Sequence, residues 1–238
     1  MKKLVLAAIL AGLVGSAAAE GITGNVAATT DYRFRGISQT QRSAAVHGGF
    51  DYSTKGGFYV GNWNSNVSSL AYTDSTGLES DIYGGYKTQI AKGVTLDVGS
   101  YNYLYSRAHG HFNSASNTNE LYAGVGVGPA TFKYSQSISE YFGIANSKGS
   151  KYVQADVNQP IAGKLTANAH IGRTLINHSS SRDYTDIKLG ATYNVAGLDV
   201  GAHYYTNTAF GSTAKAVNTI NSEQLYKNAV IVSVAKSF

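Results

Sequence analysis

The sequence is notable for what it lacks. It contains no cysteine, only 2 prolines among 238 residues, and only 14% charged residues. Without cysteine, disulfide bonds, thiolate metal sites and an acylated lipoprotein cysteine are all excluded. After residue 20, no apolar run approaches the roughly eighteen residues that a membrane-spanning helix requires, which argues against a helical membrane protein. The basic residues are dispersed, so the charge pattern does not indicate binding to nucleic acid.

The first residues have the organisation of a secretory signal peptide. Lys2 and Lys3 precede an apolar run over residues 4–14, and Ala17 and Ala19 frame an A-x-A cleavage site. We therefore expect residues 1–19 to direct Sec export and to be removed by signal peptidase, leaving 20–238 as one domain. An uncleaved anchor is the alternative, but the run is too short to cross ~30 Å of hydrocarbon.

Glycine and tyrosine are abundant, with 27 and 18 copies, and from residue 21 onward the sequence falls into twelve alternating segments. Two kinds of connection join them in strict alternation. The tight connections carry glycine, which tolerates the positive φ of hairpin turns, and lie at 54–57, 91–93, 128–130, 162–164 and 196–197. The long polar connections lie at 36–43, 67–77, 107–117, 143–149, 176–183 and 208–222.

This sorting of connections is typical of outer-membrane barrels, which have short periplasmic turns, longer external loops and an even number of strands. A soluble sandwich has no reason to sort its loops in this way. Twelve strands also enclose a space too wide for modest side chains to fill as a dry core. The sequence therefore predicts an all-β fold, a transmembrane antiparallel up-and-down β-barrel of about twelve strands with a polar lumen.

Several short stretches carry a family resemblance. They are "DYRFRGISQ", "GGFDY", "GFYVGNWNSNV" and "DIYGGY", together with the terminal Phe238. With the signal peptide and the chain length, these stretches resemble the TorF-type porin family of proteobacteria. The resemblance covers the whole chain and is most specific in the first ninety residues. It implies an outer-membrane barrel for passive transport, with no agreed substrate and no functional residues to carry over.

Side-chain alternation predicts which residues face the lumen. In "TTDYRFRGISQ", treated as the outer end of the first strand, Asp31, Arg33 and Arg35 share the inner face, whereas Tyr32 and Phe34 face lipid. We expect an interfacial aromatic girdle on the outer face; its predicted members are Tyr32, Phe34, Tyr86, Phe132, Tyr193 and Tyr204. The alternation around Trp63 is ambiguous, so it assigns this residue neither to the girdle nor to the lumen. Segment 94–106 changes phase after Val98, which predicts a bulge or an aromatic shelf.

The predicted pore-lining set contains charged and histidine side chains from most segments: Asp31, Arg33, Arg35, His47, Asp51, Asp81, Glu120, Lys133, Asp156, His170, Asp186, Lys188, Asp199, His203 and Lys227. Arg33, Arg35 and Lys227, with His47 nearby, are expected to form a basic patch near the mouth. Such a patch would give a mild preference for anions. The alternative is that these arginines pair with Asp31, Glu223 or lipopolysaccharide phosphates and only brace the rim.

Passive diffusion of small hydrophilic solutes is the predicted function, with no catalytic residues and no cofactor. An outer-membrane enzyme that acts on lipid and a structural barrel without transport are the alternatives. His109 and His111 in "RAHGHF" could hold a metal weakly, but two ligands do not make a site, so no metal is expected. "GVGVG" at 124–128 lies in a strand and opens no helix, so its glycines are expected to widen the lumen rather than cradle a phosphate.

The C-terminal stretch predicts how the barrel is inserted into the outer membrane. Val230, Val232, Val234 and Phe238 share one parity, and the terminal aromatic residue resembles the insertion signal of outer-membrane strands. Lys236 interrupts this apolar row. The expected partners are the barrel-assembly machinery, outer-membrane lipid and lipopolysaccharide, and small hydrophilic solutes. The expected location is the outer membrane of a Gram-negative bacterium.

Overall fold

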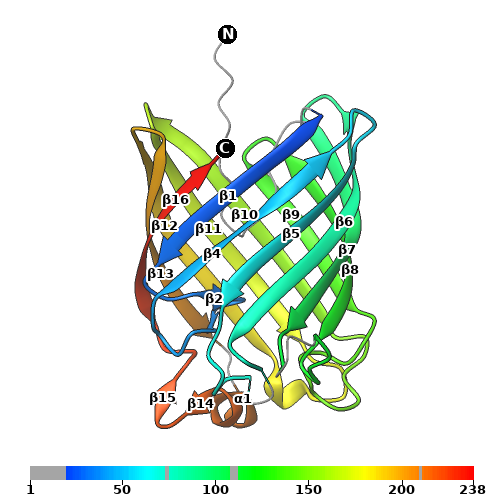
Figure 1. The fold of residues 1–238 in the computed structure, drawn as a ribbon, viewed down its shortest axis with the longest axis vertical. Helices are drawn as coiled ribbons and strands as arrows, with labels where there is room; N and C mark the ends of the chain where they lie inside the picture. Colours follow the sequence, from blue (N-terminus) through cyan, green and yellow to red (C-terminus); the bar gives the residue numbers. More distant parts are fainter. Residues whose placement is uncertain (1–19, 73–74, 108–111, 209–210) are drawn as a thin grey trace.

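Twelve long strands form one closed antiparallel barrel in the computed structural model, which describes residues 20–72, 75–107, 112–208 and 211–238 (Figure 1). The predicted signal peptide lies outside the described residues. In chain order the barrel strands are β1 (Gly21–Thr29), β4 (Ala45–Ser53), β5 (Phe58–Asn66), β6 (Leu78–Ala91), β7 (Val94–Tyr105), β8 (Thr118–Val127), β9 (Ala130–Ser137), β10 (Lys151–Ala162), β11 (Leu165–Leu175), β12 (Tyr184–Val195), β13 (Leu198–Thr208) and β16 (Ala229–Ser237). The predicted fold class is confirmed.

The barrel closes where the first strand meets the last. β1 pairs with β4 from Gly21↔Ser53 to Thr29↔Ala45, and with β16 on its other side. Beyond β16, Phe238 exchanges two backbone hydrogen bonds with Gly24, of 2.8 and 2.9 Å. The Phe238 ring lies over the α-carbon of Gly24, so a Cβ there would come within 2.5 Å of it. Closure leaves no open edge among the barrel strands, as a barrel in lipid requires.

The two ends of the barrel differ as the sequence predicts. Tight turns and the C-terminus lie at one end, at the top of Figure 1, and the long loops lie at the other. Gly93 and Gly197 have φ of 75° and 85° in two of the turns, a region that other residues rarely adopt. The long loops carry the short elements β2 (Arg33–Phe34), β3 (Ile37–Ser38), η2 (Ser180–Arg182), α1 (Ser212–Val217), β14 (Thr219–Ile220) and β15 (Glu223–Gln224).

The barrel is apolar outside and polar inside. Exposed side chains along the strands are mostly large and apolar, among them Val46, Leu189 and Val232. The alternate positions are buried and carry Asp81, Asp156 and other polar groups. Among the described residues, no helix is long and apolar enough to cross a membrane.

The end of the first strand differs from the prediction. β1 stops at Thr29, and residues 30–44, called here the inward segment, leave the wall and fold into the barrel as the β2–β3 hairpin. Arg35 and Gly36 at its tip have φ of 46° and 77°, so the chain turns where the alternation predicted an extended strand. Tyr32 is only 4% exposed and Phe34 packs against buried tyrosines, so the lipid-facing assignment of both is wrong.

The aromatic pattern of β7 also differs. Its pairing with β8 is continuous from Val94↔Val127 to Tyr103↔Thr118, so there is no bulge after Val98. Tyr103 and Tyr105 are buried on the inner face with the same parity as Asp97. The change in residue type therefore reflects aromatic side chains that line the lumen. Trp63 is also buried on the inner face. Phe132, Tyr193 and Tyr204 are exposed on the outer face as predicted.

Candidate functional site

The lumen is lined by charged side chains that come from nearly every strand. Of the predicted set, the wall residues with inward parity are His47, Asp51, Asp81, Glu120, Lys133, Asp156, His170, Asp186, Lys188, Asp199 and His203. Asp31, Arg33 and Arg35 lie on the inward segment rather than on the wall. Lys227 lies between β15 and β16, outside the barrel wall, and is exposed.

Arg35 fixes the inward segment to the opposite side of the barrel. Its Nη1 and Nη2 donate to Glu120 Oε1 and Oε2 on β8 at 2.8 and 2.7 Å, and Nη1 also donates to the Tyr141 hydroxyl at 2.9 Å. In the ring of strands, β8 is separated from β1 by four strands in one direction and six in the other. The ion pair therefore crosses the lumen, and both side chains are buried.

Aromatic rings complete the surroundings of this guanidinium. The Arg35 Cζ lies 4.1 Å from the ring centre of Tyr152 on β10 and 4.7 Å from that of Phe34. A planar guanidinium that is paired on its edge and stacked on its faces has every favourable contact available to it. Arg35 therefore acts as an anchor of the inward segment, with little capacity left to bind a passing anion.

The hairpin tip docks on a third part of the wall. Asn207 Nδ2 on β13 donates to the Gly36 carbonyl at 3.0 Å. A Cβ on Gly36 would come within 2.1 Å of Asn207 Oδ1 and 2.6 Å of Asp186 Cβ, so only glycine fits. Arg33 pairs with Asp31 within the segment at 2.8 Å, which matches the bracing alternative.

The inward segment also packs against aromatic residues of β5 and β7. Tyr32 contacts Trp63 on β5 with ring centres 5.3 Å apart, and Phe34 contacts Tyr103 on β7 at 5.2 Å. Both contacts have edge-to-face geometry, which is favourable for aromatic pairs. The inward segment thus contacts five wall strands inside the barrel, namely β5, β7, β8, β10 and β13.

A hydrogen-bonded network on β10, β11 and β12 lies beside this anchor. His170 Nδ1 lies 2.7 Å from Asp156 Oδ1, and its Nε2 lies 2.9 Å from Asp186 Oδ1. Tyr152 donates to Asp186 at 3.0 Å. A histidine held between two carboxylates is fixed in orientation, so the network stiffens the wall on which Arg35 and Gly36 dock.

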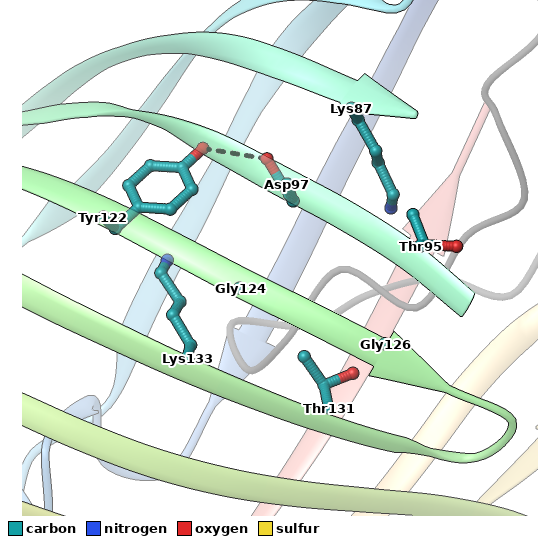
Figure 2. A pocket seen from close by; sticks show the side chains of 8 residues that line it. All are labelled: Lys87, Thr95, Asp97, Tyr122, Gly124, Gly126, Thr131 and Lys133. Carbon is teal, nitrogen blue, oxygen red and sulfur yellow. Dashed lines mark hydrogen bonds between the residues drawn. The ribbon is translucent and has the colours of Figure 1, made fainter. Parts of the chain in front are cut away.

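The half of the lumen near the tight turns contains a separate pocket of ≈ 360 Å³, counting the open space at its mouth. Its lining is Lys87, Thr95, Asp97, Tyr122, Gly124, Gly126, Thr131 and Lys133, from the four adjacent strands β6 to β9 (Figure 2). Figure 2 shows Lys87 and Lys133 on opposite sides of Asp97, with Gly124 and Gly126 on the strand between Asp97 and Lys133.

The structure does not bring the predicted basic patch together. Arg33 and Arg35 are paired with Asp31 and Glu120, and Lys227 lies on the exposed loop. Sequence reasoning omitted Glu79, Asp97 and the β7 tyrosines from the lumen. Their parity identifies them, because Asp97 alternates with Leu96 and Val98. The predicted histidine pair at 109 and 111 lies outside the described residues.

Several solved barrels have a similar fold. The KdgM porin matches with a TM-score of 0.57 over 91% of this chain and 99% of its own, at 8% identity. A KdgM porin in complex with disordered oligogalacturonate gives 0.56 over 92% and 99%, at 7% identity. The NanC porin gives 0.55 over 89% and 97%, at 9% identity. At these identities the likeness concerns the fold alone.

Sequence comparison adds a family. Among curated proteins, none is significantly similar to the chain in sequence. A family model described as "Bacterial protein of unknown function (Gcw_chp)" matches residues 14–238, nearly the whole chain, and the protein therefore belongs to this family.

Proposed function

We propose that the protein is an outer-membrane channel of porin type, through which small hydrophilic solutes diffuse passively. The observation that carries this proposal is the polarity of the closed barrel. Val46 and Val232 are 63% and 45% exposed on the outside, while carboxylates such as Asp81 and Asp156 are buried inside. Such a surface suits hydrocarbon outside and water inside, which is the arrangement of outer-membrane barrels.

The inward segment determines the width of this channel at the loop end. It is fixed by the Arg35–Glu120 pair, by the Gly36–Asn207 hydrogen bond and by the Tyr32–Trp63 aromatic contact. Solutes pass between this segment and the wall, so discrimination by size occurs there. The mild preference for anions stays a prediction, and its source cannot be a patch at the mouth, where the arginines are paired.

The finer assignments belong to the same proposal. The resemblance to TorF-type porins, the fold shared with KdgM and NanC, and the terminal Phe238 support insertion by the barrel-assembly machinery into a membrane that contains lipopolysaccharide. The KdgM complex with oligogalacturonate supports small sugar-like solutes as cargo. No catalytic role is assigned to any residue.

Reconstitution tests the proposal. Purified protein without residues 1–19 is refolded in detergent, and its folding is checked by the heat-dependent shift in gel mobility. It is then added to a planar bilayer in KCl. Discrete conductance steps are the expected result. A folded barrel that gives no steps and admits no sugar into liposomes contradicts the proposal and favours a structural barrel. Release of fatty acid from the bilayer lipid contradicts it too, and favours an outer-membrane enzyme that acts on lipid.

A further inference from the structure

The charged groups of the pocket near the tight turns are paired differently from Arg33, Arg35 and His170. Elsewhere Arg35, Arg33 and His170 are held by carboxylates within 3 Å. The pocket contains two lysines and a single carboxylate, Asp97, whose Oδ1 accepts a hydrogen bond from Tyr59 at 2.6 Å. The pocket therefore carries an excess of positive charge.

Lys133 is the main source of this excess. Its Nζ lies 3.9 Å from the ring centre of Tyr122, and no carboxylate of the described residues lies within ion-pair distance of it. A ring face orients an ammonium group but does not neutralise its charge. Its N–H donors are therefore directed by Tyr122 and remain able to bind an anionic group that enters the pocket.

A second observation also indicates a ligand. The Thr131 hydroxyl is buried and has no hydrogen-bond partner among the described residues, although it lines the same pocket. A buried hydroxyl without a partner has lost its hydrogen bonds to water and gained none in return, which is unfavourable. A solute hydroxyl or carboxylate at this position would remove that cost.

The space for the solute comes from glycine. A Cβ on Gly124 would meet nothing closer than 3.4 Å, and on Gly126 nothing closer than 3.8 Å. Both glycines are therefore free of the close backbone contacts that require glycine elsewhere, for example at Gly36. Their effect is to leave room between the lysines.

We propose that this pocket binds a small hydroxylated carboxylate, such as a sugar acid, as a subsite of the channel. The carboxylate lies between Lys87 and Lys133, and a hydroxyl or carboxylate oxygen pairs with Thr131. This inference rests on the proposed channel function and names the class of solute it selects. It also places the source of the anion preference in the tight-turn half of the lumen rather than at the mouth.

The test uses two probes that differ in one group, D-glucuronate and D-glucose. Titration calorimetry on the detergent-folded protein measures binding directly, and the KCl conductance in a planar bilayer measures transient block. We expect saturable binding and block by glucuronate and neither by glucose. Lys133→Gln and Thr131→Val are expected to weaken glucuronate binding by about tenfold each, as for loss of one charged hydrogen bond.

Two further variants complete the design. Gly126→Val fills the pocket and is expected to abolish binding. Lys148→Gln removes an exposed lysine on a long loop and is the matched control, with unchanged binding. A channel that conducts KCl but binds glucuronate no better than glucose overturns the subsite and leaves the channel intact. Equal binding in Lys133→Gln and wild type also overturns it. Absence of conductance counts against the channel alone, because calorimetry does not depend on it.

Discussion

Arg35 and Glu120 form a buried ion pair whose members come from distant parts of the sequence. Each side chain is less than 10% exposed, and the pair has the bidentate geometry that suits guanidinium and carboxylate. A buried pair of this kind contributes little net stability, but removal of one partner costs about 3–5 kcal/mol because a charge is left unpaired. Its value lies in fixing one position of the inward segment.

Glu120→Gln is expected to release the inward segment and raise single-channel conductance. Arg35 would otherwise remain buried without its carboxylate, whereas β8 keeps its backbone pairing with β7 and β9, so the barrel persists. Conductance in planar bilayers is the measurement. Arg42→Gln is the matched control, because it breaks the half-exposed pair between Arg42 of the same segment and Glu223 on β15. Equal conductance in Glu120→Gln and wild type would show that this ion pair does not hold the constriction.

At the scale of elements, alternation predicted the barrel strands well and the inward segment badly. The tight and long connections follow from glycine and polar content, which are local signals. The hairpin β2–β3 is itself extended, so "DYRFR" alternates just as a barrel strand does. What turns it inward is its pairing with Glu120, which lies 85 residues away. No local pattern contains that information, and for the same reason the predicted basic patch was wrong.

The last strand gives a prediction at this scale. The Phe238 ring packs edge-on against Phe50 with centres 6.3 Å apart and covers Gly24, so it seals the β1–β16 seam. Phe238→Ala is expected to lower the fraction of folded barrel in detergent or lipid refolding, as read from heat-dependent gel mobility. Lys236→Ala, which changes an exposed residue on the same strand, should fold as the wild type does. Equal folding of both variants would show that Phe238 is not needed to close the β1–β16 seam.

At the scale of the whole molecule, the apolar outer surface supports the proposed location in a membrane. Leu189 is 54% exposed near the middle of β12. If this surface meets hydrocarbon, Leu189→Arg should lower the free energy of unfolding in lipid vesicles by about 2–4 kcal/mol. Thr192→Lys changes the inner face of the same strand and should cost much less, since the lumen holds water. Urea titration of both variants in vesicles measures the difference. Equal costs would contradict a membrane-embedded outer face.

The docking of the inward segment has a consequence for the order of events in time. The segment follows the first strand of the chain, yet its anchors, Glu120 and Asn207, lie 85 and 171 residues after Arg35 and Gly36. They become available only when later strands have joined the sheet. The inward segment can therefore take its final position only after β8 and β13 are in place. The bore at the loop end is set by contacts that form late, whatever the order in which the strands themselves pair.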